Sequence, residues 1–150
     1  MTPLAKDSHN GVTELNYGLS VGLDVPYEVA RALVIDALRD EGFGVLTEID
    51  VRRTLKEKIG ADFQPYAILG ACNPTLAHAA LTRDVDAGLL LPCNVVVRQY
   101  GDGAVVSLLD PLLISRLSPV EGLQEIAASA RKKIERVATR LAESNRAGAA

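Results

Sequence analysis

The stretch NVVVRQYGDGAVVSLLDP, residues 94–111, decides the fold class, because it joins two apolar runs through a tight glycine-rich turn. Gly101-Asp102-Gly103 is a strong signal for a short hairpin between two strands. The first strand is predicted over residues 89–100, with an interruption at Pro92, and the second over residues 104–109. A hairpin pairs its strands antiparallel, so the sheet is predicted to be mixed or antiparallel and not doubly wound.

Strands and helices alternate on the N-terminal side of this hairpin. Apolar patterns predict three earlier strands, over residues 15–23, 43–49 and 65–72. Capping residues and helical spacing predict four helices, over residues 26–41, 51–59, 74–83 and 119–144. The predicted fold is therefore α+β, a single domain over residues 14–144 with about five strands and about four helices. Residues 1–13 are predicted to be a flexible leader and residues 145–150 a disordered tail.

Composition excludes several classes of protein. The chain has 150 residues, a formal net charge of −3 and 4% aromatic residues, so it lacks the basic surface of a nucleic-acid-binding protein. No apolar run is long enough to span a membrane, and the N-terminus lacks the apolar core of a secretory signal. We therefore expect no nucleic-acid or membrane partner and a cytoplasmic location, where both cysteines stay reduced.

The motifs of the large enzyme classes are missing from the sequence. It contains no G-x-G-x-x-G, no P-loop, no H-E-x-x-H and no G-x-S-x-G. The two cysteines lie 21 positions apart and form no C-x-x-C pair, so the spacing does not support a metal site. We therefore predict no cofactor and no metal, and no catalytic residue can be named.

Cys72 and Asn73 mark the passage from a strand into a helix. Asn73 stands before Pro74, an arrangement typical of a helix N-cap. Cys72 directly precedes the helix N-terminus, where backbone N–H groups favour an anion and can make a thiol reactive. Alternatively, Cys72 is a small buried apolar residue, as free cysteines often are.

Three further residues are candidates for the same pocket. His78 flanks the apolar face of the predicted helix, and it is either a half-exposed structural residue or an acid–base group. Tyr66 either points its hydroxyl into a pocket or packs in the core. Cys93 follows Pro92 and comes to the same end of the sheet as Cys72 if their two strands are antiparallel. The predicted pocket is bounded by Tyr66, Cys72, Asn73, His78 and Cys93.

The long C-terminal helix predicts a contact between two copies of the chain. Its apolar residues follow one narrow stripe, at Leu123, Ala127, Ala130, Ile134, Val137 and Leu141. The predicted helix is about 39 Å long at about 1.5 Å per residue, longer than one sheet face covers. We therefore expect the outer half of the stripe to contact a second copy in a homodimer, unless the helix bends and a sheet edge forms the dimer.

Several unusual dipeptides occur in a fixed order: Pro65-Tyr66, Asn73-Pro74, Leu91-Pro92 and Asp110-Pro111. With GFGV at residues 42–45 and the segments LAHAAL and GLLLPCNVVVR, they resemble the bacterial and archaeal family known as domain of unknown function 302 (DUF302). This resemblance implies a small α+β fold that forms a homodimer. It implies no activity and no substrate.

These observations favour a non-enzymatic, dimeric module that binds a small molecule or another protein. A second hypothesis is a thiol-dependent redox or metal-handling protein that uses Cys72. A third is a hydrolase that needs no cofactor.

Overall fold

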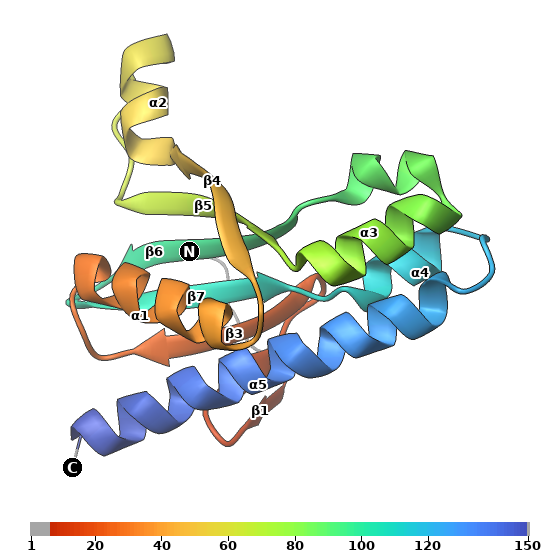
Figure 1. Ribbon diagram of the computed structural model, residues 1–150. Helices are drawn as coiled ribbons and strands as arrows, with labels where there is room; N and C mark the ends of the chain where they lie inside the picture. The colour runs from red at the N-terminus through yellow and green to blue at the C-terminus, as the bar shows by residue number, and fades with distance from the viewer. Residues whose placement is uncertain (1–6, 150) are drawn as a thin grey trace.

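A computed structural model describes residues 7–149, and Figure 1 shows their arrangement. The predicted hairpin is present: β6 (Cys93–Tyr100) and β7 (Gly103–Leu109) pair antiparallel, with Tyr100 opposite Gly103. All other neighbouring strands are antiparallel too. The sheet has seven strands in the order β1-β2-β3-β7-β6-β5-β4, so the hairpin lies at its centre.

The predicted α+β class is confirmed. The other strands are β1 (Asp7–His9), β2 (Val12–Glu14), β3 (Gly18–Leu23), β4 (Gly44–Asp50) and β5 (Tyr66–Cys72). The helices are α1 (Tyr27–Asp40), α2 (Val51–Ile59), α3 (Pro74–Arg83), the 3-10 helix η1 (Val85–Leu90), α4 (Leu112–Leu117) and α5 (Leu123–Ala149). Beyond the expected elements, the described residues add the strands β1 and β2, the helix α4 and the 3-10 helix η1.

The main core lies between the sheet and the helices α1 and α5, which pass over the same face of the sheet (Figure 1). Burial alternates along the central strands: Val95 and Val97 of β6 and Val106 of β7 are completely buried on this face. Alternation of this kind is expected where one face of an antiparallel sheet packs on helices and the other does not.

The N-terminus differs from the predicted flexible leader. Within residues 7–14, β1 and β2 form a hairpin that extends the sheet beyond β3. Its turn consists of Asn10 and Gly11, whose φ angles are 54° and 83°. Positive φ at both positions is what a tight hairpin turn requires, and Asn-Gly is the sequence signal for it. Residues 1–6, the rest of the predicted leader, lie outside the described residues.

The start and end of the C-terminal helix also differ from the prediction. Ser118 does not cap α5; its hydroxyl instead donates a hydrogen bond to Asp84 at 3.2 Å. Gly122 has a φ of 90°, which interrupts the helical backbone, so α5 begins at Leu123. At the other end α5 continues to Ala149, through most of the predicted disordered tail, while residue 150 lies outside the described part.

The expected exposed half of the α5 stripe is not exposed. Ile134, Val137 and Leu141 are all buried within one chain. The reason is that the N-terminal hairpin widens the sheet and α1 lies beside α5, so α5 has contacts with β2, β3 and α1 along its length. Contrary to the prediction, this stripe therefore needs no second copy to cover it.

α2 has a different environment from the other long helices. Its main contacts are with the two strands that flank it in sequence, β4 and β5, and none of its residues is buried. Figure 1 shows it standing beyond the β4–β5 edge of the sheet. No helix in the described part of the chain is long and apolar enough to cross a membrane.

Candidate functional site

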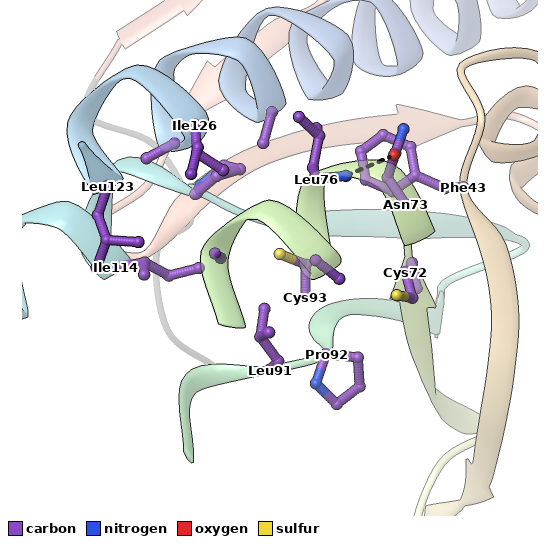
Figure 2. A pocket seen from close by; sticks show the side chains of 16 residues that line it. Phe43, Cys72, Asn73, Leu76, Leu91, Pro92, Cys93, Ile114, Leu123 and Ile126 are labelled. Atoms are coloured by element: carbon purple, nitrogen blue, oxygen red, sulfur yellow. Dashed lines mark hydrogen bonds between the residues drawn. The ribbon is translucent and has the colours of Figure 1, made fainter. Parts of the chain in front are cut away.

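An apolar pocket lies where the C-terminal end of β5 and the start of β6 meet α3, α4 and α5 (Figure 2). Its cavity volume is about 50 Å³. The lining residues are Phe43, Ala71, Cys72, Asn73, Leu76, Ala77, Ala80, Leu91, Pro92, Cys93, Pro111, Ile114, Leu123, Ile126, Ala127 and Ala130. No charged side chain and no histidine is among the lining residues that the structure describes.

The position of α3 follows from its first residues. The side-chain oxygen of Asn73 accepts a hydrogen bond from the backbone N–H of Leu76 at 3.2 Å, the dashed line in Figure 2. This confirms the predicted N-cap, and Pro74 occupies the first helical turn. The cap sets where α3 begins, at the end of β5, and so places Leu76 and Ala77 on the pocket wall.

Small side chains leave space for the cavity. Ala80 of α3 faces the pocket, and Ala127 and Ala130 of α5 line it from the other helix. The sequence shows these α5 alanines as part of the apolar stripe, but it does not show that α3 lies opposite them. The pocket is thus built by two helices that are far apart in the chain.

Cys72 and Cys93 both line this pocket, and both are free thiols. β5 and β6 are antiparallel with Ala71 opposite Cys93, so the two cysteines come to the same end of the sheet. Burial, together with the nearby Cys72, raises the pKa of Cys93 to about 11. The Cys93 thiol therefore stays protonated near neutral pH, and it behaves as an apolar wall residue.

Two of the five predicted site residues lie elsewhere. Tyr66 lines a groove of about 280 Å³ with Tyr17 and Arg98, on the sheet face that α1 and α5 do not cover. Its ring packs edge-on against Phe63, with 5.8 Å between the ring centroids. His78 is exposed on α3 and does not line the apolar pocket. The structure therefore brings together Cys72, Asn73 and Cys93, without Tyr66 and His78.

Several pocket residues were not predicted from the sequence. Ile114 belongs to α4, a helix that no pattern in the sequence predicts, and Phe43 comes from the turn before β4. Leu91 and Pro92, joined by a cis peptide bond, were interpreted only as part of a strand. Leu91-Pro92 was among the dipeptides that suggested the family, and this was the only signal that drew attention to the segment.

A larger polar cleft of about 580 Å³ lies between the N-terminus of α1, the end of β4 and the start of α2. Here Arg31 donates two hydrogen bonds to the carboxylate of Glu48, and this bonding lowers the pKa of Glu48. Burial, followed by the charges of Glu28 and Asp50, raises the pKa of Tyr27. Charged residues of both signs line this cleft, and Arg31 and Glu48 already form an ion pair, so it presents no strong field of one sign.

A metal centre finds no support in the described residues. No three or more His, Cys, Asp or Glu side chains are close enough together there to hold a metal ion. The two pocket thiols, without a third ligand, do not form a closed zinc site. The apolar pocket thus presents mainly hydrocarbon side chains.

Comparison with known proteins supplies the family context. The model of the family described as "Domain of unknown function DUF302" matches residues 19–141, a span that contains every residue of the apolar pocket. The crystal structure of an uncharacterized conserved DUF302 protein from Bacillus stearothermophilus is similar, with 31% sequence identity and a TM-score of 0.75. That similarity covers 85% of this chain and 99% of the other. No curated protein matches the sequence.

Proposed function

Because this chain belongs to the DUF302 family, whose description assigns no activity, we propose a function from its site: a homodimeric, non-enzymatic module that binds a small apolar group. The group would occupy the pocket between α3 and α5. The observation that supports this most strongly is the lining: among the described residues that form it, Asn73 is the only strongly polar side chain, and its oxygen already caps α3.

The described lining holds no carboxylate, histidine, lysine or arginine, and this argues for binding over hydrolysis. General acid–base catalysis needs a carboxylate, histidine, lysine or similar group within hydrogen-bond reach of the substrate. His78, the candidate named from the sequence, is exposed outside the pocket. An apolar ligand, in contrast, needs only the removal of hydrocarbon surface from water, which is favourable in proportion to the area buried.

The cavity volume limits the size of the group that can bind. Pockets for drug-sized molecules typically hold about 300–1,000 Å³, whereas this cavity has about 50 Å³. A complete drug-sized ligand would therefore not fit into this cavity. We therefore propose that the pocket takes a group of a few carbon atoms, such as the end of an acyl chain.

Titration with hexanoate, followed by ¹H–¹⁵N NMR, tests this proposal. We expect saturable shifts at the amides of Leu76, Ala77 and Ile126, which line the pocket. Ala77→Leu fills the pocket and should abolish those shifts. Ala32→Leu adds the same atoms on the exposed side of α1 and should leave them unchanged. Equal binding by both variants, or shifts confined to the sheet groove beside Tyr17, would contradict the proposal.

The second hypothesis, a thiol-dependent redox or metal-handling protein, is supported by fewer residues than the binding module. Its attacking group would have to be Cys72 alone, because the raised pKa of Cys93 leaves little thiolate near neutral pH. Cys72 is partly exposed at the pocket, so it is the thiol that an entering molecule would meet first.

A further inference from the structure

Large apolar side chains are exposed at several places in the described part of the chain, and two of these places lie at opposite ends of the molecule. The first is α2 with the loop after it, where Ile59 is 72% exposed. The second is η1, where Val85 is 79% and Leu89 is 87% exposed. In the view of Figure 1, α2 and η1 (green, between α3 and β6) lie on the same side of the molecule, at its two ends.

α2 is an amphipathic helix whose apolar face is only partly covered by the described residues of its own chain: Val51 and Leu55 are half-buried, whereas Ile59 is exposed. Val51, Leu55 and Ile59 follow a spacing of four residues and share one face of the helix. A helix of nine residues is too short to be stable in water by itself, so an apolar face that is left partly in water is costly. Phe63, in the loop after α2, is also exposed and extends the apolar surface.

The charge of α2 is positive. The helix has four basic residues and one acidic residue, a net charge of +3. Arg53 pairs with Glu57, and Lys56 pairs with Asp62. Arg52 and Lys58 have no ion pair with any residue that the structure describes, so α2 presents basic side chains beside its apolar face.

The surface of η1 has the opposite charge. Asp84 and Asp86 stand at its start, next to Val85. Asp84 holds the segment in place, because it accepts hydrogen bonds from the backbone N–H of Asp86 at 3.1 Å and from the Ser118 hydroxyl at 3.2 Å. Asp86 is exposed, so its carboxylate is available to a partner. η1 therefore combines apolar side chains with acidic ones on a fixed backbone.

We propose that α2 of one copy docks on η1 of a second copy, and that this reciprocal contact forms the homodimer. The inference rests on the homodimer of the proposed function. A two-fold axis makes every contact twice, so one chain must supply both halves of the contact. This chain has both halves: an apolar basic helix and an apolar acidic turn, on the same side and at opposite ends. Charge complementarity distinguishes a second copy from an unrelated apolar partner.

The proposed contact also affects the apolar pocket. η1 continues directly into Leu91 and Pro92, which line that pocket. A partner's α2 seated on η1 would therefore hold one wall of the pocket in position. In the dimer, each ligand site would depend on a helix from the other copy.

Light scattering on the full chain tests the interface. We expect the wild type to have twice the mass of the 16.0 kDa chain. Ile59→Glu and Leu89→Glu should each weaken the dimer by about 100-fold or more, since each places a charge in the centre of the contact. Both side chains are largely exposed in one chain, so neither variant should disturb folding. The control is Tyr17→Glu, at a residue 74% exposed on the uncovered sheet face, which should leave the dimer intact.

A pair of charge reversals tests which surfaces meet. Lys58→Glu and Asp86→Lys should each weaken the dimer several-fold, and the double variant should recover most of the affinity, because the charges are then exchanged and again opposite. A double variant weaker than either single one would overturn the pairing of α2 with η1.

Three further outcomes would each contradict the proposed interface, and each would do so for a different reason. A dimer that survives Ile59→Glu and Leu89→Glu but not Tyr17→Glu would overturn this interface and leave the proposed homodimer standing. A wild type that is monomeric at high concentration would overturn both. A monomer that sediments with phosphatidylserine vesicles, and loses this with Ile59→Glu, would assign α2 to a membrane surface instead.

Discussion

Cys93 shows how position in the fold changes the chemistry of one side chain. It lies on the covered face at the start of β6, against the apolar pocket, and is 8% exposed. Burial disfavours the thiolate, and a nearby Cys72 thiolate would add like-charge repulsion. The same residue on the surface would ionise at a lower pH and react more readily.

The raised pKa of Cys93 predicts a loss of stability in alkali. The unfolded thiol has a pKa of about 8.5, whereas the folded one has a pKa of about 11. As the pH rises, the unfolded chain loses its proton first, so the contribution of Cys93 is complete below about pH 8.5 and is lost as the pH rises toward about 11. The loss should reach roughly 2–3 kcal/mol in urea unfolding experiments.

Cys93→Ala provides the control, because other groups also titrate in alkali. The difference in unfolding free energy between wild type and variant should shrink between about pH 8 and about pH 11. A difference that stays constant would mean that Cys93 is not protected by burial. Alkylation of each cysteine by iodoacetamide, followed by mass spectrometry, should show Cys72 reacting before Cys93 at neutral pH.

At the scale of single elements, α5 decides more of the packing than any other helix. It contacts β2, β3, α1, α3 and α4, and its stripe of apolar residues is buried along its length. Its first turns line the apolar pocket, through Leu123 and Ile126, while later turns close the main core. One helix therefore connects the pocket to the core.

The burial of α5 within one chain predicts the effect of truncating its side chains. Leu141→Ala should cost about 2–5 kcal/mol of unfolding free energy, because it leaves a cavity in the core, where Leu141 is 2% exposed. The mass measured by light scattering should not change. Leu117→Ala, at an exposed position of α4, should change stability by no more than about 0.5 kcal/mol. Loss of the dimer in Leu141→Ala without loss of stability would assign α5 to the interface after all.

At the scale of the whole molecule, one ion-pair network joins three distant segments. Arg131 of α5 contacts Asp110 at 3.0 Å, Glu14 at 2.9 Å and Glu135 at 2.7 Å. Asp110 follows β7 and Glu14 ends β2, so the network ties the N-terminal hairpin and the centre of the sheet to the helix. Asp110 is nearly buried and also accepts a hydrogen bond from the backbone N–H of Leu112 at 2.9 Å.

Removing the carboxylate of Asp110 should therefore destabilise the whole chain. Asp110→Ala leaves the largely buried Arg131 without its most buried partner, and we expect a loss of about 3 kcal/mol in urea unfolding. Arg116 lies 3.9 Å from the same carboxylate and is exposed. Arg116→Ala should change stability by no more than about 1 kcal/mol, as surface ion pairs usually do. Equal losses in the two variants would show that burial does not strengthen the network.

Part of the candidate site could be predicted from the sequence, because it depends only on residues that are close together in the chain. The Asn73 cap and the Asp50 cap of α2 depend on residues within four positions of each other, and both hydrogen bonds are present. The sequence does not determine whether Cys72 and Cys93 lie at the same end of the sheet, because this depends on whether β5 and β6 run antiparallel. His78 and Tyr66 were grouped with them by sequence proximity, which does not determine the face of a sheet or helix.

The sequence by itself determined the α+β class, the antiparallel hairpin and the two helix caps at Asp50 and Asn73, because each depends on neighbours in the chain. Only the tertiary structure decided that β1 and β2 extend the sheet, that α5 is buried within one chain and that α3 and α5 enclose an apolar pocket. These features come from contacts such as Glu14 with Arg131, 117 positions apart. Contacts of that kind depend on how all the elements pack together, and no local pattern of residues specifies them.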